Sequence, residues 1–336
     1  MIREAIVKLT KKEDLTKKEM QISIGEIMQG KASPVQISAF LTASIFKGVT
    51  IDELTAAALA MRSFVKKIKP RNKVTLDTCG TGGDGVGTFN ISTIASLVVS
   101  AAGVNVAKHG NRSVSSKCGS ADLLEALGVK IDLGPDKVKD CIDSIGIGFM
   151  FAPLFHPAMK YAQPVRRELG IRTIFNYLGP LTNPAFAKYQ LVGVSQQSLL
   201  KQSVLALKEL GSIHVLVVRG LDGLDEITTT AKTQVFELKN GKIREFTLSQ
   251  FEFGIKRANI KDLLGKDKYT NAQIAREILD GKKSPKRDIV CLNAGAALYV
   301  SGVVRSIKEG FELANITVDS GRAKEKLRSF IEFTNK

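Results

Sequence analysis

The chain of 336 residues has no tryptophan, only three histidines and only four cysteines. The cysteines, Cys79, Cys118, Cys141 and Cys291, lie far apart, so the sequence predicts neither a CxxC zinc site nor a disulfide framework. A reduced, cytoplasmic protein is therefore expected. Cys79 and Cys118 fall in glycine-rich segments. A nucleophilic role is one interpretation for them, but packing of a small side chain is favoured.

Long apolar runs are also missing, which excludes a membrane-spanning helix and argues against a membrane partner. The two longest apolar stretches, 94–106 and 289–304, are interrupted by Ser, Gly or Asn and predict buried helices. The first residues lack the apolar core of a signal peptide. With 44% apolar and 24% charged residues, the composition is typical of a globular protein with one large or two unequal domains.

Acidic residues are scarce relative to basic ones, and the formal net charge is +16. This excess indicates either a polyanionic partner, such as nucleic acid, acidic lipid or a phosphorylated substrate, or simply a lysine-rich solvated surface. Nucleic acid is disfavoured as the partner because no basic stretch is interleaved with aromatic residues for base stacking.

Residues 1–70 have the apolar periodicity of helices. Ser33, followed by proline, is expected to start one helix, Gly48 to end it and Asp52 to begin the next. Pro70 closes this block. The N-terminal part is therefore predicted to be a small all-helical unit.

After Lys73 the pattern changes, and short β-prone segments alternate with helical ones. This alternation predicts an α/β fold with a parallel or mixed sheet and helices on both faces. Asn240 and Gly241 predict a type I′ turn in a hairpin of residues 233–248. The C-terminal part returns to helix and ends in residues 320–333. The other expected strands are 74–76, 104–107, 147–151, 190–194 and 213–218.

The stretch 77–90 reads DTCGTGGDGVGTFN and follows the expected strand 74–76. Its glycines suit a loop with exposed amides, and Ser92 or Thr93 can cap the helix behind it. A glycine loop before a helix N-terminus is an anion site. It matches neither the P-loop nor the dinucleotide fingerprint. Asp84 would repel phosphate, so a sugar hydroxyl, an amide or a metal-bound water is its expected partner.

A second polar segment, residues 108–120, reads KHGNRSVSSKCGS and also follows a β-prone segment. Lys108, Arg112 and Lys117 stand among four serines, and such charged and hydroxyl donors suit phosphate oxygens. His109 could contact an aromatic ring or cap a helix. A polar surface loop is the alternative interpretation, but two such loops after neighbouring strands favour a shared phosphate site.

The acidic residues Asp222, Asp225 and Glu226 come directly after a strand predicted from apolar residues. Adjacent carboxylates at a strand end suit Mg²⁺, which binds through carboxylates, waters and substrate phosphates. An acidic turn is the alternative interpretation.

The segment 153–184 is rich in proline, arginine and aromatic residues, and it could cross between the two units. Its cationic side chains could grip a carboxylate, as arginine does bidentately. His156 can equally be a packed loop histidine. No Ser-His-Asp or Cys-His spacing calls for a nucleophile. The cationic candidates are His156, Arg166, Arg167 and Arg172.

With these motifs in order, the chain resembles the anthranilate phosphoribosyltransferases over nearly its whole length. The resemblance rests on GTGGD with TFNIST, KHGNRSVSS, RxxLGIRTIFNYLGPLTNP and DGLDE. It implies a helical domain (1–70, joined by part of 160–184), an α/β domain (71–336), a homodimer and Mg²⁺. It also implies the reaction of 5-phosphoribosyl 1-diphosphate with anthranilate to give N-(5-phosphoribosyl)anthranilate and diphosphate, a step of tryptophan biosynthesis.

The resemblance also implies roles for individual residues, none of them an acid or a base. Mg²⁺ would be held by Ser92, Asp225 and Glu226. Anthranilate would be bound by Gly80, Asn111 and Arg166, the last two also positioning it. The residues expected at phosphoribosyl diphosphate are Gly80, Gly83, Asp84, Thr88, Asn90, Ser92, Thr93, Lys108, His109, Gly110, Asn111, Arg112, Ser113, Val114, Ser115, Ser116 and Ser120.

Two rival functions remain open at this point. A pyrimidine nucleoside phosphorylase would share the fold and related sugar chemistry. That family has a His-Ser pair where this chain has Thr78 and Cys79, and it carries an extra C-terminal domain. A catalytically silent nucleotide-binding or nucleic-acid-binding protein is the rival from another class, and the intact DGLDE and KHGNR runs argue against it.

Overall fold

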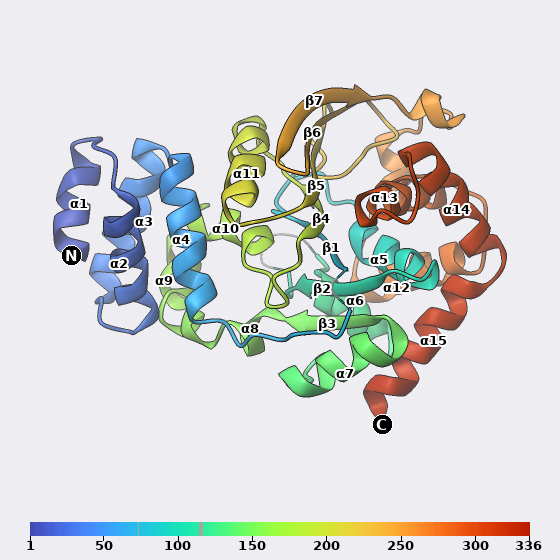
Figure 1. Ribbon diagram of the computed structural model, residues 1–336, viewed down its shortest axis with the longest axis horizontal. Helices are drawn as coiled ribbons and strands as arrows, with labels where there is room; N and C mark the ends of the chain where they lie inside the picture. The colour runs from blue at the N-terminus through green and yellow to red at the C-terminus, as the bar shows by residue number, and fades with distance from the viewer. Residues whose placement is uncertain (73, 114–116) are drawn as a thin grey trace.

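Four helices form the N-terminal part of the fold and lie side by side, away from the sheet (Figure 1). The computed structural model describes residues 1–72, 74–113 and 117–336. Capping boxes at Thr16, Ser33 and Thr50 start the second, third and fourth helices. Because Thr50 is the cap, the fourth helix begins one residue before the predicted Asp52. The helices are α1 (Ile2–Thr10), α2 (Lys17–Met28), α3 (Pro34–Lys47) and α4 (Ile51–Ser63).

The rest of the chain is built on one seven-stranded mixed sheet in the order β3-β2-β1-β4-β5-β6-β7. The first five strands of this order are parallel, and β6 and β7 continue the sheet as an antiparallel hairpin. The hairpin turn is confirmed, since Asn240 and Gly241 both have positive φ (49° and 78°). The strands are β1 (Thr75–Gly80), β2 (Asn105–Gly110), β3 (Ile147–Phe151), β4 (Tyr189–Gly193), β5 (His214–Gly220), β6 (Thr233–Lys239) and β7 (Lys242–Leu248).

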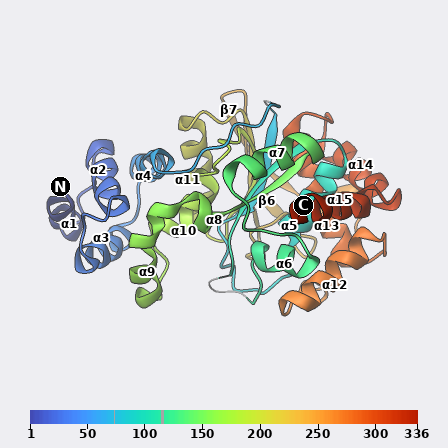
Figure 2. The ribbon, with the colours of Figure 1, turned by 90° about the horizontal axis from the view of Figure 1, so that it is seen from below.

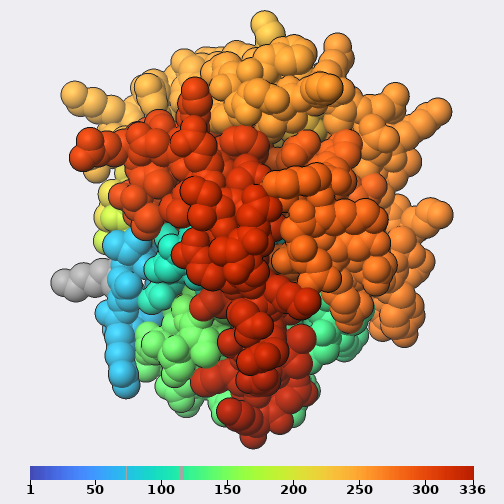
Figure 3. All heavy atoms as spheres, turned by 90° about the vertical axis from the view of Figure 1, so that its right-hand side faces the viewer, coloured from blue at the N-terminus to red at the C-terminus, as the bar shows by residue number. Residues whose placement is uncertain are grey.

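Helices cover both faces of this sheet, as the sequence predicts (Figures 1 and 2). The C-terminal helices, orange to red, cover one side of the molecule (Figure 3). Two stretches, 94–106 and 289–304, were predicted to be buried helices. The second is helical as far as Ser301, whereas the first is divided between a helix that ends at Ala101 and a strand that begins at Asn105. The helices are α5 (Ile91–Ala101), α6 (Ser120–Leu127), α7 (Pro135–Ile145), α8 (Ala152–Phe155), α9 (Gln163–Leu169), α10 (Ile174–Leu178), α11 (Gln197–Glu209), α12 (Lys268–Leu279), α13 (Pro285–Ser301), α14 (Ile307–Asp319) and α15 (Arg322–Asn335).

Strand β5, which lies between β4 and β6 in the interior of the sheet, shows how the core is divided. Its residues are buried on both faces, as expected of a parallel strand between helical layers. Val215 and Val217 pack in the cluster that contains α11 and the N-terminal helices. Leu216 and Val218 pack in the cluster that contains α5, α13 and α15. The sheet therefore separates two apolar cores, and the helical block shares one of them.

Helices α9 and α10 lie against α3 and α4, on the side of the N-terminal block (Figure 2). Ala162, Val165, Ile174 and Phe175 are buried in the same apolar cluster as the N-terminal helices. We propose on this basis that residues 1–70 and part of 160–184 form one helical domain, with the remainder of 71–336 as the α/β domain.

Three local predictions need correction. Strand β1 continues to Gly80 and β2 continues to Gly110, although both ends were expected in loops. The reason is non-local: Gly80 pairs with Gly193 of β4, and Gly110 pairs with Phe151 of β3. Helix α5 begins at Ile91 after Asn90, so Ser92 and Thr93 lie in its first turn and cap nothing. Over the described ranges, no helix is long and apolar enough to cross a membrane.

Candidate functional site

The candidate site lies at the carboxyl edge of the parallel strands. The chain builds β1, β2 and β3 toward one edge and then places β4 and β5 on the other side of β1. Such a reversal of strand order leaves a crevice at the carboxyl ends, where ligands of open α/β sheets bind. Four strands there end in glycine, at Gly80, Gly110, Gly193 and Gly220. The glycine loop (within residues 77–90) continues from the end of β1, and the second polar segment (within residues 108–120) continues from the end of β2. The DGLDE segment (residues 222–226) follows the end of β5.

The glycines are needed because neighbouring segments approach the strand ends closely. A Cβ on Gly193 would lie 1.6 Å from the backbone oxygen of Asp225. A Cβ on Gly80 would lie 2.6 Å from Oδ2 of the same Asp225. The absence of side chains at these two strand ends therefore lets Asp225 lie directly over the carboxyl ends of β1 and β4.

Asp225 and Glu226 join the DGLDE segment to the glycine loop and to the start of α5. The Gly82 N–H donates to Asp225 Oδ2 at 2.8 Å, and the Ser92 N–H donates to Glu226 Oε1 at 3.2 Å. The pair thus contacts both the glycine loop and the first turn of α5. Asp222 behaves differently: it accepts hydrogen bonds from Leu224 N–H at 3.2 Å and from threonine hydroxyls, so it shapes the turn.

The electrostatics of this pair favour a bound cation. Burial, and then the charge of Asp84, raise the pKa of Asp225 to about 6. Burial and the adjacent Asp225 raise the pKa of Glu226 well above its usual range. Lys108 lies close enough to oppose that increase, yet its Nζ donates to the Thr78 carbonyl at 2.6 Å. The buried lysine therefore acts on Glu226, whereas the cation that opposes the increase in the pKa of Asp225 is Arg172.

These residues fit Mg²⁺, a hard cation that takes oxygen ligands. Asp225 accepts the Gly82 N–H and Glu226 accepts the Ser92 N–H, and a carboxylate has further lone pairs to offer a cation. The hydroxyl of Ser92 has no hydrogen-bond partner among the described residues. Within the described ranges, no three His, Cys, Asp or Glu side chains form a metal cluster. The protein would thus supply part of a coordination shell that waters and substrate phosphates complete, which is usual for Mg²⁺.

Asp84 lies in the glycine loop, with Oδ1 accepting the Val86 N–H at 3.1 Å. Burial raises the pKa of this carboxyl. An amide was one of its three expected partners, and this bond confirms that contact. Thr88 pairs with Leu264 in an isolated β-bridge, which joins the loop to the segment before α12.

The second polar segment divides into three parts. Lys108, His109 and Gly110 belong to β2, and the buried Lys108 side chain points to β1 rather than into the loop. Asn111 accepts from the Ser120 hydroxyl at 3.2 Å through its backbone carbonyl. The predicted site residues Val114, Ser115 and Ser116 lie outside the described residues.

Two supporting residues behind the site had no clear signal in the sequence. The buried Asp77 accepts the His109 N–H at 3.2 Å and the Asn183 Nδ2–H at 2.7 Å. Asn183 also donates to the Ala107 carbonyl at 2.9 Å. These bonds tie β1, β2 and the end of the proline-rich segment together. Asn183 lies in the LTNP run, and the sequence indicated no role for it beyond its place in this proline-containing motif.

The arginines of the proline-rich segment have different surroundings. Arg166 is half-buried and lies over the Phe175 ring at 5.5 Å. No carboxylate or hydrogen-bond acceptor pairs with its guanidinium in the part of the chain that the structure describes, and burial lowers its pKa. Arg167 is exposed. Arg172 donates to Ser195 Oγ at 2.9 Å and to the Gly82 carbonyl at 3.3 Å, so it supports the glycine loop instead of gripping a carboxylate.

His109 and His156 form a pair with ring centroids 5.0 Å apart. Burial lowers the pKa of His109 to about 3 and that of His156 to about 4. Both rings are therefore neutral at pH 7, and the Nε2 atom of each is buried without a partner among the described residues. His156 is a packed histidine, with 6% of its surface exposed. His109 contacts a ring, as one expectation had it, and caps no helix.

The His156 pKa predicts acid sensitivity of the fold. The unfolded chain binds a proton near pH 6.5, whereas folded His156 binds it only near pH 4. The contribution of neutral, buried His156 to the free energy of unfolding is fully present above pH 6.5. It falls by about 1.4 kcal/mol per pH unit as the pH drops toward 4. Urea unfolding between pH 7 and 4.5 should show a shallower loss for His156→Gln than for wild type. Parallel curves would contradict the assignment.

Burial disfavours the nucleophilic thiolate form of the two cysteines near the site. Burial raises the pKa of Cys79 well above its usual range and raises that of Cys118 to about 11. Both stay protonated at neutral pH, whereas the thiolate is the reactive form. Packing of a small side chain is therefore the correct interpretation for both.

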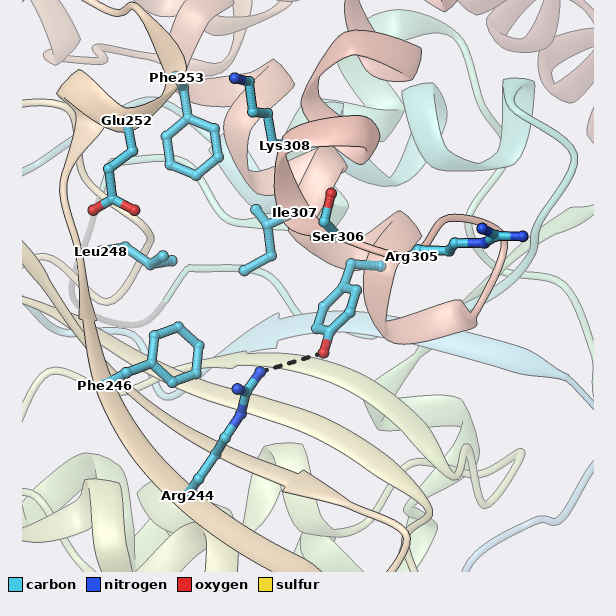
Figure 4. Close-up of a pocket in the computed structure, with 10 residues that line it drawn as sticks. Arg244, Phe246, Leu248, Glu252, Phe253, Arg305, Ser306, Ile307 and Lys308 are labelled. Atoms are coloured by element: carbon cyan, nitrogen blue, oxygen red, sulfur yellow. Dashed lines mark hydrogen bonds between the residues drawn. The ribbon is translucent and has the colours of Figure 1, made fainter.

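A separate hollow of about 340 Å³ lies between β7 and the start of α14 (Figure 4). Arg244, Phe246, Ile307 and Lys308 are among its lining residues. None of the residues expected from the sequence to bind substrate or metal lines it. The candidate site is thus identified by its converging side chains and backbone amides, not by the depth of a cavity.

Comparison with known proteins agrees with this geometry. The model of the glycosyl transferase family, a/b domain, matches residues 72–324, and the model of its helical bundle domain matches residues 3–65. Anthranilate phosphoribosyltransferase of Acetivibrio thermocellus is 53% identical over 335 residues, covering 100% of this chain and 97% of the relative. That of Methanobrevibacter smithii is 51% identical and covers 100% of both.

Solved structures give the same result. The anthranilate phosphoribosyltransferase of Thermus thermophilus has a TM-score of 0.93 at 43% identity over 99% of both chains. The enzyme of Saccharomyces cerevisiae in complex with PRPP and Mg has a TM-score of 0.92 at 28% identity, over 99% of this chain and 98% of the other. These matches confirm the predicted fold, and the chain belongs to the anthranilate phosphoribosyltransferase family of glycosyl transferases.

Proposed function

We propose that this protein transfers the phosphoribosyl group of 5-phosphoribosyl 1-diphosphate to the amine of anthranilate. The products are N-(5-phosphoribosyl)anthranilate and diphosphate, in a step of tryptophan biosynthesis. The observation that carries the proposal is the meeting of Asp225 and Glu226 with the glycine loop and the first turn of α5. It occurs in a chain that matches enzymes of this name over their whole length.

The diphosphate end of the substrate fits the carboxyl edge of the sheet. The glycine loop and the start of α5 present backbone N–H groups, and the helix dipole adds a partial positive charge there. Mg²⁺, held by Ser92, Asp225 and Glu226, would neutralise the negative charge that develops on the leaving diphosphate. Donors fixed before the reaction stabilise such charge without reorganisation. The glycine loop and the second polar segment would hold the phosphates and the ribose.

The acceptor substrate fits Arg166. Anthranilate carries a carboxylate, and the guanidinium of Arg166 is half-buried without an acidic partner among the described residues. With Gly80 and Asn111, Arg166 would place the amine beside the anomeric carbon. An aromatic amine is already unprotonated at neutral pH, so positioning supplies much of the rate and no strong base is required. This agrees with the absence of a catalytic dyad from the sequence motifs.

The same proposal includes a homodimer, as the family resemblance implies, and a cytoplasmic location, as the spacing of the four cysteines predicts. Relatives from Saccharomyces cerevisiae have been solved with PRPP and Mg and with 4-fluoroanthranilate. These ligands support the proposed substrates and the proposed use of Mg²⁺.

The proposal is tested by mixing the protein with anthranilate, 5-phosphoribosyl 1-diphosphate and Mg²⁺ and following anthranilate fluorescence. We expect the fluorescence to fall only when all three are present. A phosphorolysis assay with pyrimidine nucleosides and inorganic phosphate, run in parallel, should show no turnover. Phosphorolysis with unchanged anthranilate fluorescence would replace the proposed reaction by the rival one. Binding of phosphoribosyl diphosphate without either turnover would indicate a silent binding protein.

Replacing Arg166 separates the two substrates. A hydrogen bond to a charged group contributes about 1.5–3 kcal/mol, so Arg166→Ala should raise the KM for anthranilate about 10- to 100-fold. The KM for phosphoribosyl diphosphate should change little. Arg167→Ala is the matched control, because Arg167 is the exposed neighbour on the same helix. Equal effects of the two variants on the anthranilate KM would assign the carboxylate to another residue.

A further inference from the structure

We propose that Arg172 is a positioning residue for the transfer reaction: it holds the carbonyl groups of the glycine loop, so that two backbone N–H groups of the loop are directed at the diphosphate. The inference rests on the proposed function and concerns the same site. Arg172 is half-buried in the short link between α9 and α10. The sequence suggested it only as a partner for a carboxylate, and no role in shaping the loop followed from any motif.

The link that carries Arg172 is fixed at both ends. Helix α9 ends at Gly170, which has a left-handed φ of 61°. Helix α10 begins after Thr173, a fully buried residue whose N–H donates to Asn176 Oδ1 at 2.9 Å. Only Ile171 and Arg172 lie between these two residues. The Arg172 side chain therefore reaches the glycine loop from an anchored backbone.

The guanidinium of Arg172 binds the carbonyl side of the loop. Its Nη2 group donates to the Gly82 carbonyl at 3.3 Å and also to the Gly83 carbonyl. Its Nη1 group donates to Ser195 Oγ at 2.9 Å, and this hydroxyl in turn donates to the Gly82 carbonyl at 3.1 Å. A planar group with several fixed donors thus holds two consecutive carbonyls, with the help of one hydroxyl.

Peptide geometry then fixes the direction of two amides. In a planar trans peptide, the carbonyl of one residue and the N–H of the next point in opposite directions, and the described residues contain no cis peptide bond. Since the Gly82 and Gly83 carbonyls point toward Arg172, the Gly83 and Asp84 N–H groups point away from it. Neither N–H has an acceptor within the described part of the chain. Successive N–H groups of this kind form a concave site for an anion.

The loop needs this support because packing does not hold it. Gly82, Gly85 and Gly87 have positive φ values of 66°, 76° and 78°, and a Cβ added to any of them would meet nothing within 4 Å. Glycine also has more conformational freedom to lose than any other residue. Hydrogen bonds must therefore define the shape of the loop, and Arg172 and Ser195 supply those on its carbonyl side.

Two neighbouring residues separate the direction of hydrogen bonds from the amount of positive charge. Arg219 Nε donates to the Ser195 carbonyl at 3.1 Å, and among the described residues no hydrogen bond joins Arg219 to the glycine loop. Arg219→Ala thus removes a nearby cation and leaves the loop contacts in place. Ser195→Ala does the reverse, because it removes the hydroxyl between Arg172 and the Gly82 carbonyl and keeps the charge of Arg172.

The test measures the binding of inorganic diphosphate and Mg²⁺ to the free protein by calorimetry, together with steady-state kinetics. Arg172→Ala should weaken diphosphate binding about tenfold and raise the KM for phosphoribosyl diphosphate by a similar factor, because two amides lose their fixed direction. Ser195→Ala should change both quantities about threefold in the same direction. Arg219→Ala should leave both within about twofold of wild type, and the anthranilate KM should stay within about threefold in all three variants.

Unchanged diphosphate binding in Arg172→Ala would overturn the proposal, and unchanged binding in Ser195→Ala would do so if Arg172→Ala does not fold. An equal loss in Arg219→Ala would also overturn it, because charge and not the direction of the amides would then be responsible. So would an equal rise of the anthranilate KM, which would mean that the link before α10 has moved. If the wild type binds diphosphate without turning over anthranilate, the proposed function fails, and the diphosphate results still decide the role of Arg172.

Discussion

Asp225→Asn combined with Glu226→Gln should lower kcat by about 100- to 1,000-fold and remove the response of the rate to Mg²⁺. The magnitude corresponds to the loss of about 3–4 kcal/mol of electrostatic stabilisation of a developing charge. The physical reason is that these two carboxylates lie close together at the carboxyl edge of the sheet, and burial raises the pKa of both. The double variant removes both carboxylates that are proposed to hold the divalent cation.

The measurement is a Mg²⁺ titration of the initial rate, together with thermal unfolding with and without Mg²⁺. Asp222→Asn is the matched control in the same segment. Asp222 accepts from Thr228 Oγ1 at 2.7 Å and from Leu224 N–H at 3.2 Å, so its variant should lose stability and keep its Mg²⁺ dependence. If Asp222→Asn shifted the Mg²⁺ midpoint and the Asp225 and Glu226 changes did not, the metal ligands would have to be reassigned.

Gly193→Ala should lower kcat/KM by about 100-fold or more although no side chain of the site is changed. A Cβ at this position would lie 1.6 Å from the Asp225 backbone oxygen and 2.5 Å from its carbonyl carbon. These are backbone atoms, so the DGLDE segment itself must move. A displacement of about 1 Å in a positioned group is enough for a loss of about 100-fold, and the overpacking itself costs about 1–3 kcal/mol of stability.

Gly25→Ala is the comparison for this variant. Gly25 lies inside α2, and nothing stands within 4 Å of an added Cβ. Its replacement should leave the kinetics unchanged and stabilise the fold by about 0.5–1 kcal/mol, because alanine lowers the entropy of the unfolded chain. Kinetics and urea unfolding of both variants provide the check. Full activity of Gly193→Ala would show that Asp225 need not hold its position over the strand end.

The helical domain and the hairpin were predictable because their signals are local. Ser33 followed by Pro34 starts α3, and Asn240 with Gly241 turns the hairpin, as the sequence indicates. A capping hydroxyl acts on amides two or three residues away, and a type I′ turn depends on two consecutive φ angles. The start of α4 at Ile51, one residue before the predicted Asp52, has the same local nature, since Thr50 and Glu53 form the capping box.

The ends of β1 and β2 were not predictable from local signals. Glycine disfavours a strand interior, and the motifs around Gly80 and Gly110 are typical of loops. Pairing with β4 and β3 outweighs that preference and carries both strands to their glycines. Lys108 consequently lies in a strand and is buried against Thr78, although its motif suggested a residue in a phosphate-binding loop.

By itself, the sequence predicted the classes of chemistry that we propose for the site: a phosphate cradle of glycines and hydroxyls, an acidic pair for Mg²⁺ and a cationic side chain for a carboxylate. Each depends only on which side chains are present and on short spacings. The tertiary structure alone decided which of them meet. Asp225 and Glu226 contact Gly82 and Ser92 from more than 130 positions away, Arg172 supports the glycine loop, and the two histidines pair. Such contacts depend on strand order and on which strand ends lie side by side at the carboxyl edge of the sheet, which no local pattern encodes.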